Sequence, residues 1–308
     1  QLLAHLRGQL VMPTTTENDE PLDASLHPQT LVKPLGGRFG QEPGDEVEVP
    51  SQSVVQSEQL DQHHHNSFQR HIFWLHIQKT GTSFFNTMYL NLCPKVLASF
   101  PNLTTTTEKL SDKILLQLAP AQEYCPNLIY PNFPGKHHPL RPYLHPKNMT
   151  VFTMLRDAKD RLLSAFFFDR HGSRNRNSTL AEFLAEPQIP NCQIKMILGF
   201  RCHQQVEESL LNVSKALQIF QSQHFFFGMT DRWDESICLF HAWYMGGRRQ
   251  MYAFELQNNR PTRRHLMDTT ILDQNYTDLD VQFLIPKAKE IFEDRLKEAN
   301  CLGFQASV

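Results

Sequence analysis

The amino-acid sequence predicts an α/β fold in which helices flank a central parallel sheet. Three short apolar runs, rich in aromatic and β-branched residues, predict buried strands at residues 72–77, 151–155 and 225–229. Segments with helical spacing follow these strands. Strands that alternate with helices favour a parallel sheet, because each return to the same end of the sheet needs a long crossover.

The segments with helical spacing predict helices at residues 84–92, 107–118, 156–170, 206–223, 231–244 and 279–299. Asp231 is expected to cap the fifth helix, since a short acidic side chain accepts hydrogen bonds from the first N–H groups of a helix. Pro286 is expected to bend the last helix or to set its start, because proline fits without loss only in the first turn.

Residues 1–66 differ in composition from the rest of the 308-residue chain. They are rich in Pro, Gln, Glu, Thr and Gly, and their only aromatic residue is Phe39. This composition predicts a disordered stem or linker, followed by one folded domain at residues 67–308. The three histidines at residues 63–65 fit a solvated polar run better than a metal site.

Charge and cysteine usage argue against two classes of protein. The formal net charge of −2 disfavours a general nucleic-acid binder. None of the six cysteines forms a C-x-x-C pair, which disfavours a zinc site. Their even number permits disulfides. Cys192 and Cys202 lie close enough in sequence for a local disulfide, and two buried thiols are the alternative.

Sequons favour a protein of the secretory pathway. Asn-x-Ser/Thr sequences occur at Asn102, Asn148, Asn177, Asn212 and Asn275. No run of about 20 apolar residues is present, so no membrane-spanning helix is predicted within the sequence. The chain begins with Gln rather than Met, which leaves an N-terminal anchor upstream open.

A polar turn at residues 78–83 joins the first predicted strand to the first predicted helix. The N-terminus of a helix offers unpaired N–H groups and partial positive charge to an anion. Gly81 allows close approach of the backbone, and Lys79 adds a positive charge. The turn therefore predicts a phosphate or sulfate site. It is not a Walker A loop, and no acidic strand end for Mg²⁺ is evident, which disfavours a nucleoside triphosphatase.

A second anion site is predicted where the strand at 151–155 ends. Ligands of such sheets gather at the carboxyl ends of the strands, and Arg156 falls at this end. Ser164 lies eight residues further on, about two helical turns, so both side chains can share one helical face. The alternative is an arginine that caps the helix or pairs with Asp160 on its surface.

These two elements, in this order, resemble the two motifs by which sulfotransferases bind 3′-phosphoadenosine 5′-phosphosulfate (PAPS). The most similar group is that of Golgi glycan enzymes, which includes heparan sulfate 2-O- and 6-O-sulfotransferases. Residues 76–84 (His-Ile-Gln-Lys-Thr-Gly-Thr-Ser-Phe) resemble its 5′-phosphosulfate loop, and residues 155–166 its 3′-phosphate motif. Residues 191–199 and 227–239 are similar to two further segments of the group.

The resemblance has two departures. Thr82 stands where the usual loop has a second glycine, and Ala158 stands where many members have proline. The first can alter the geometry of the loop slightly, and neither removes a charged group.

The resemblance implies a P-loop-like three-layer fold, PAPS as the donor and no metal. Lys79 would contact the bridging oxygen and stabilise the leaving phosphate. Backbone N–H groups would cradle the 5′-phosphate, and Arg156 and Ser164 would bind the 3′-phosphate. The cradle residues are Thr80, Gly81, Thr82 and Ser83.

The acceptor hydroxyl needs a general base near neutral pH, for which histidine fits best. By the resemblance this base lies between the two motifs, where His137 is the first candidate, His138 the second and His145 a weaker one. Glu123 is a possible carboxylate substitute. Each histidine can equally be an exposed loop residue. The basic residues 260–265 could close over the 3′-phosphate, touch an anionic acceptor, or form a solvated loop.

The sequence thus predicts a PAPS-dependent O-sulfotransferase acting on a glycan or glycoconjugate. The overall acidity argues mildly against a long polyanionic acceptor, although a local basic groove could override it. The resemblance implies a glycoprotein of the Golgi lumen, a type II membrane protein with an anchor upstream and residues 1–66 as its stem. The alternatives are a P-loop kinase-like phosphotransferase and a non-catalytic glycan-binding protein on the same fold.

Overall fold

The computed structural model describes residues 71–99, 125–128, 137–140, 149–169, 171–247, 251, 255, 272 and 276–306. The predicted stem at 1–66 and the helix predicted near 107–118 lie outside these residues. The described part is an α/β structure with a parallel sheet. Among its helices, none is long and apolar enough to cross a membrane.

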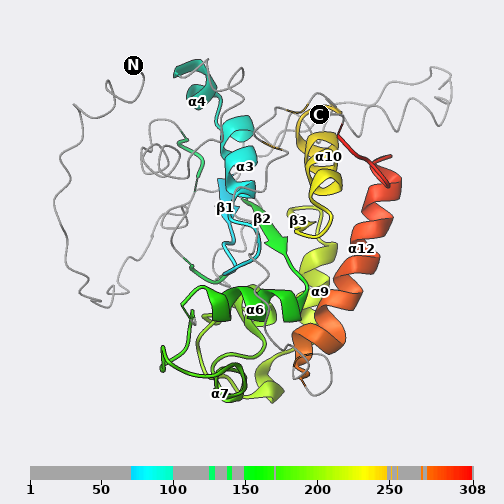
Figure 1. The fold of residues 1–308 in the computed structure, drawn as a ribbon. Helices are drawn as coiled ribbons and strands as arrows, with labels where there is room; N and C mark the ends of the chain where they lie inside the picture. Colours follow the sequence, from blue (N-terminus) through cyan, green and yellow to red (C-terminus); the bar gives the residue numbers. More distant parts are fainter. Residues whose placement is uncertain are drawn as a thin grey trace, which may run out of the picture. The chain divides into compact units, whose positions relative to one another are not determined.

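Three parallel strands form the described sheet, in the order β1 (His71–Trp74), β2 (Met149–Leu155) and β3 (Phe225–Met229) (Figure 1). The predicted parallel sheet is therefore confirmed. β1 is shorter than expected, because the chain turns after Leu75. The Leu75 N–H still donates to Phe152 at 2.8 Å, whereas the next two N–H groups bond two residues back along their own chain.

The described helices alternate with these strands. They are α3 (Phe84–Leu92), α4 (Pro94–Ser99), α6 (Ala158–Phe167), α7 (Leu180–Ala185), α8 (Cys192–Leu198), α9 (Val213–Gln221), α10 (Trp233–Tyr244) and α12 (Ile285–Glu298), with the single turns η3 (Glu208–Leu210) and η4 (Asp280–Leu284). The helix predicted at residues 84–92 coincides with α3. The sequence did not predict α4, α7 or α8.

Three predicted helix starts are wrong. α6 begins at Ala158 rather than at residue 156, because the Asp157 side chain accepts hydrogen bonds from the first N–H groups of the helix. The helix predicted at 206–223 is divided into η3 and α9, and the Asn212 side chain caps α9 by accepting from Lys215 N–H at 2.9 Å. The cap residue of α10 is Arg232, so Asp231 does not cap it.

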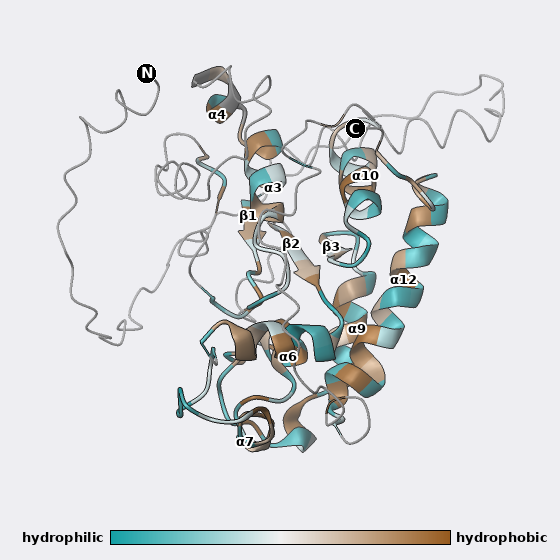
Figure 2. Ribbon diagram, in the orientation of Figure 1, coloured by the Kyte–Doolittle hydropathy of each residue, from teal (hydrophilic) through white to brown (hydrophobic). Residues whose placement is uncertain are grey.

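The expectation for Pro286 is confirmed. α12 begins at Ile285, and the proline lies in its first turn. The turn before it, η4, is π-helical. The buried residues of α12 recur at helical spacing, and Figure 2 shows hydrophobic and hydrophilic residues side by side along it.

Helices pack on both faces of the sheet. The Phe226 ring lies 5.5 Å from Phe84 of α3 and 5.8 Å from Phe240 of α10, measured between ring centroids. Phe227 points to the opposite face, because successive side chains of a strand alternate. Its ring lies 4.9 Å from Phe220 of α9 and 6.1 Å from Phe292 of α12. Each buried phenylalanine contributes about 1.5–3 kcal/mol.

Arg295 ties α12 to β3 and α9 from inside the core. Its guanidinium donates to the carbonyl oxygens of Phe225, at 3.1 Å, and of Phe220. It also lies 4.9 Å from the ring centroid of Phe227 and 4.8 Å from that of Trp243. Burial lowers the pKa of Arg295 to about 10, so the side chain remains charged at neutral pH. One cation thereby pairs carbonyl groups from two elements.

All six cysteines form disulfides, namely Cys93–Cys125, Cys192–Cys202 and Cys238–Cys301. The Cys192–Cys202 disulfide excludes the alternative of two buried thiols at these positions. Cys238–Cys301 joins α10 to the residues that follow α12.

Replacing Cys238 and Cys301 by alanine should destabilise the protein by about 2–4 kcal/mol. The disulfide closes a segment with a sequence separation of 63, which limits the freedom of the unfolded chain. The matched control is the Cys192/Cys202 double variant, whose separation is 10. The entropic contribution to its loss of unfolding free energy should be about 1.5 kcal/mol smaller than in the Cys238/Cys301 variant. Urea unfolding of both variants measures the difference, and equal midpoints would contradict this account.

Candidate functional site

A tightly turned loop leads from the end of β1 into α3. Its backbone has positive φ at Lys79 (66°) and at Gly81 (88°). A positive φ is costly at lysine, so other contacts must hold the turn. The Thr80 hydroxyl donates to the Ile77 carbonyl at 2.9 Å, and the His76 ring bonds the Thr82 hydroxyl at 2.9 Å.

Gly81 lies directly against the residues that follow β3. A Cβ atom added to it would lie 2.8 Å from Cγ2 of Thr230 and 3.3 Å from Cζ3 of Trp233. Both the backbone conformation and the lack of space therefore require glycine here. This contact fixes the loop at the carboxyl edge of the sheet.

The loop presents a row of unused backbone donors. The N–H groups of Thr80, Gly81, Thr82 and Ser83 donate to no other residue that the structure describes. Ser83 is the cap residue of α3, and its side chain makes no capping bond. These donors lie at the positive end of the helix dipole, an arrangement that suits an anion.

Arg156 meets this loop from the end of β2. Its Nη1 donates to the Lys79 carbonyl oxygen at 3.4 Å. The side chain of Gln193 holds the backbone of Arg156 at both polar atoms, accepting from its N–H at 3.1 Å and donating to its carbonyl at 2.9 Å. Burial lowers the pKa of Arg156, while the charge of Asp160 raises it. The structure thus brings the two predicted anion-binding elements together.

Ser164 lies buried in the last turn of α6. The expectation that it shares a helical face with Arg156 is wrong, because Arg156 precedes the helix by two residues. The charge of Asp160 raises the pKa of Arg156, so the alternative of a pair between these two residues stays open.

The Lys79 side chain points toward the segment after α6. Its ammonium nitrogen lies 3.7 Å from the ring centroid of Phe168, a cation–π contact. The Phe168 ring is 55% exposed and lies 5.9 Å from the ring of His171, between centroids. A cation and an open aromatic face therefore lie side by side at this end of the sheet.

His137 is held in one tautomer. Its Nδ1 lies 3.0 Å from the His76 carbonyl oxygen, which can only accept, so Nδ1 carries the proton and the lone pair of the neutral ring is on Nε2. The two rings lie 4.2 Å apart. Burial lowers the pKa of His137, and the charges of His138 and Lys79 act in the same direction. His138 is half-buried beside it.

Two further histidines, His171 and His203, form a row of neighbouring rings with His137. The His171 ring lies 5.8 Å from that of His137 and 5.3 Å from that of His203. Burial lowers the pKa of both His171 and His203 to about 4, assisted by positive neighbours. Gly172 makes room for this packing, since a Cβ there would lie 2.3 Å from the His203 ring. In the described ranges no group of His, Cys, Asp and Glu could hold a metal ion.

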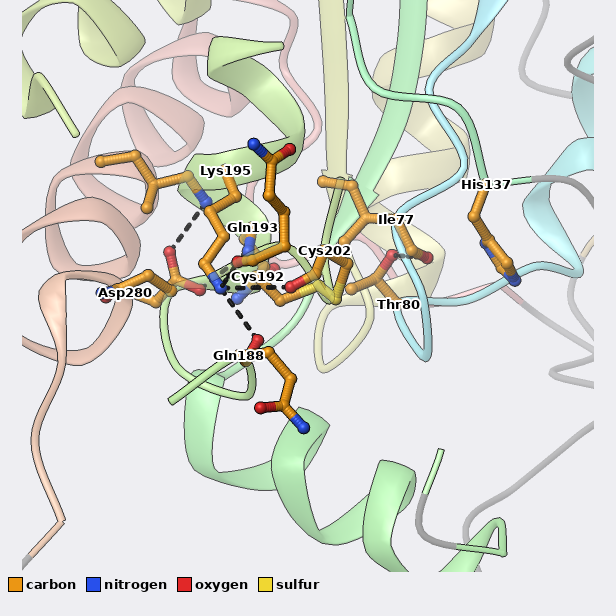
Figure 3. Close-up of a disulfide and its surroundings, with 12 residues drawn as sticks. Ile77, Thr80, His137, Gln188, Cys192, Gln193, Lys195, Cys202 and Asp280 are labelled. Carbon is orange, nitrogen blue, oxygen red and sulfur yellow. Dashed lines mark hydrogen bonds between the residues drawn. A yellow bond between two sulfur atoms is a disulfide. The ribbon is translucent and has the colours of Figure 1, made fainter. Parts of the chain in front are cut away.

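A cavity of about 430 Å³ opens beside these rings. It is lined by Gln78, His137, Arg201, Cys202, His203 and Gln204. Its wall at residues 201–204 is fixed by the Cys192–Cys202 disulfide and by Lys195. The Lys195 ammonium donates to the carbonyls of Gln188 and Cys202 at 2.9 and 3.2 Å (Figure 3). It also donates to the Gln204 carbonyl at 2.9 Å. Burial lowers the pKa of Lys195 to about 8.

Asp280 anchors α8, which carries both Gln193 and Lys195. Its carboxylate accepts from the N–H groups of Gln193 and Ile194 at 2.8 and 2.9 Å. Burial and the nearby charge of Asp278 raise the pKa of Asp280. Helix α8 therefore positions Arg156 through one side chain and the cavity wall through another.

Several sequence predictions fall outside the described residues. They are His145, Glu123, residues 260–265, the histidines at 63–65, and the sequons at Asn102, Asn148 and Asn275. Asn177 and Asn212 are described, and both are exposed. Sequence reasoning missed His171, His203 and Gln78. The only signal for the role of Gln193 was the resemblance of residues 191–199.

Replacing Gly81 by alanine should destabilise the protein by about 2–4 kcal/mol, because a strained backbone and a close contact add up. Gly303 is the matched control. It also has positive φ (72°), but nothing lies within 4 Å of a Cβ built on it. The Gly303→Ala variant should lose only about 1 kcal/mol. Denaturant unfolding measures both variants, and equal losses would rule out the packing contribution.

Acidification should destabilise the fold through His171 and His203. Their pKa of about 4 lies below that of an unfolded histidine, so between pH 6.5 and 4 only the unfolded state takes up these protons. Stability should therefore fall as the pH falls through this window. In His203→Gln the fall should be smaller. Thermal unfolding at a series of pH values checks this, and parallel curves for the two proteins would disprove it.

Comparison with known proteins gives no match: no family model, no curated protein and no solved structure is similar to this chain. The geometry of the loop, of Arg156 and of the cavity is therefore the ground for assigning a function.

Proposed function

We propose that this protein transfers a sulfuryl group from PAPS to a hydroxyl of a glycan or glycoconjugate. The observation that carries the proposal is the Lys79 loop, whose unused N–H donors lie beside Arg156 and near a histidine with its lone pair on Nε2. The parallel sheet with helices on both faces is compatible with the P-loop-like three-layer fold that the proposal includes.

The donor needs two separated anion sites, and the chain offers positive groups for both. In the proposal, the N–H groups of Thr80 to Ser83 bind the 5′-phosphate, and Lys79 stabilises the charge on the leaving phosphate oxygen. Arg156 and Ser164 bind the 3′-phosphate, which distinguishes PAPS from ordinary adenine nucleotides. Two hydrogen bonds from the Gln193 side chain to the Arg156 backbone hold Arg156 in a position where its side chain contacts the loop.

The acceptor needs a base. In the proposal, the acceptor oxygen forms a bond to sulfur while the bond between sulfur and the bridging oxygen breaks, and His137 Nε2 takes the hydroxyl proton. A neutral imidazole is required for this step. The lowered pKa of His137 supports it, because the ring is then neutral at pH 7.

The proposal includes a place in the Golgi lumen as a type II membrane protein, with an anchor upstream and residues 1–66 as a stem. Three disulfides within the described residues support an oxidising compartment, since cytosolic proteins rarely keep such bonds. The exposed sequons at Asn177 and Asn212 agree with glycosylation there.

The direct test combines donor binding and turnover. Adenosine 3′,5′-bisphosphate should raise the melting temperature, and radiolabelled PAPS should pass its sulfur to at least one member of a panel of glycans, proteins and phenols. A shift with ATP and Mg²⁺ alone would instead indicate a phosphotransferase. Donor binding without turnover on any acceptor would indicate a glycan-binding protein.

Replacing Lys79 or Arg156 by alanine should weaken binding of adenosine 3′,5′-bisphosphate roughly 10–100-fold, since each loss removes a charge-assisted contact. Arg176→Ala is the matched control, because this arginine pairs with Asp169 in an exposed ion pair. Isothermal titration gives the three affinities. Unchanged affinity in both site variants would remove the basis of the proposal.

His137→Ala should lower kcat by about 10²–10⁴-fold and leave donor affinity unchanged. In the wild type, kcat should be flat at neutral and alkaline pH and fall on the acid side, where the ring becomes protonated, because burial lowers the pKa of His137. His138→Ala is the control and should keep most of the activity. Transfer rates at a series of pH values decide the assignment, and the opposite pattern would make His138 the base.

A further inference from the structure

The Gln78 side chain is buried. Gln78 is 6% exposed, and its Oε1 has no hydrogen-bond partner among the described residues. Neither end of its amide bonds to any residue in the described part of the chain. Buried amides are nearly always paired, because leaving one unpaired costs free energy that folding does not recover. A ligand that binds this amide would offset the cost.

Gln78 lies in the cavity that also contains the proposed general base. It directly precedes Lys79, the residue proposed to act on the leaving group, and it lines the same cavity as His137. The cavity lining also includes the polar residues Arg201 and His203. Because both residues line this cavity, a molecule bound there can contact His137 with one group and the Gln78 amide with another.

We propose that Gln78 binds the hydroxyl adjacent to the one that reacts, so that the acceptor is a vicinal diol such as a pyranose ring supplies. This inference rests on the proposed sulfotransferase function and names the acceptor chemistry of the same site. An amide offers one accepting and one donating end. A hydroxyl both donates and accepts, so it pairs with the amide in either orientation, whereas a carboxylate only accepts and an ammonium group only donates.

Three matched alcohols test the inference without knowledge of the natural glycan. They are cyclohexanol, trans-1,2-cyclohexanediol and trans-2-acetamidocyclohexanol, each offered with radiolabelled PAPS. The wild type should prefer the diol over cyclohexanol by at least about 10-fold in kcat/KM, the effect of one hydrogen bond to a buried polar group. In Gln78→Met, a variant of similar size that makes no such bond, the preference should fall to about 2-fold, the statistical factor for two hydroxyls.

Two readouts separate a specificity role from a structural one. Gln78→Met should keep the wild-type melting temperature and the wild-type affinity for adenosine 3′,5′-bisphosphate, since no hydrogen bond of the folded protein is lost. Gln223→Met is the control, because this glutamine is exposed and bonds its neighbour His224. It should keep the full preference for the diol.

The experiment distinguishes a failure of the inference about Gln78 from a failure of the proposed function. If the wild type transfers sulfur to glycans but shows no preference for the diol, or keeps that preference in Gln78→Met, the inference about Gln78 is wrong and the proposed function stands. A preference for the acetamido alcohol overturns the inference in favour of an amino sugar. If the wild type transfers no sulfur from PAPS to any acceptor, the proposed function and the inference fail together.

Discussion

The contact between Gly81 and the residues after β3 is the constraint on which the candidate site depends. Gly81 packs against Thr230 and Trp233 so closely that no other side chain fits, and it does so with a positive φ. The loop therefore leaves β1 in a fixed direction, with its N–H groups turned away from the protein's own acceptors. An anion site of this kind needs rigidity, because N–H donors of a loop that can rearrange pair with carbonyl oxygens of the protein and are then lost to a ligand.

Helix α8 supports the site from behind although none of its residues was predicted to be helical. Gln193 holds the backbone of Arg156, and Lys195 holds the wall of the cavity through three carbonyl groups. Both residues belong to the segment whose resemblance to glycan sulfotransferases was noted from sequence alone. The structure gives that segment a physical role in placing other residues, and it needs no direct contact with a ligand to fulfil it.

Local patterns in the sequence suffice to predict the central strands of the sheet but not every element around them. The apolar runs predicted β2 and β3 because strands buried on both faces are continuous in hydrophobicity. The end of β1 was missed, since Leu75 and Ile77 continue its apolar run although the chain leaves the sheet after Leu75. Helix α8 was missed because it begins with Asn191 in a left-handed conformation (φ 63°) and is anchored by Asp280, 87 residues away.

Some residues of the candidate site could be predicted from local sequence patterns, and others could not. Lys79 and Arg156 were predicted together because each follows a recognisable strand, and the structure joins them through the Lys79 carbonyl. His171 and His203 could not be predicted, because no spacing relates them. They meet through Gly172, whose missing side chain admits the His203 ring. The role of Gln78 could not be predicted from the sequence either, since only the folded structure shows whether a buried amide has a hydrogen-bond partner.

The disulfide at Cys202 carries a consequence for how the protein matures. Cys202 lines the cavity itself, and its partner Cys192 begins the helix that positions Arg156. Oxidation of this pair thus closes the cavity wall and fixes the supporting helix in one covalent step. A newly made chain with reduced thiols lacks that restraint, and we expect ligand binding to appear only as the chain is oxidised. The compartment in which the chain folds would then also set when its site becomes competent.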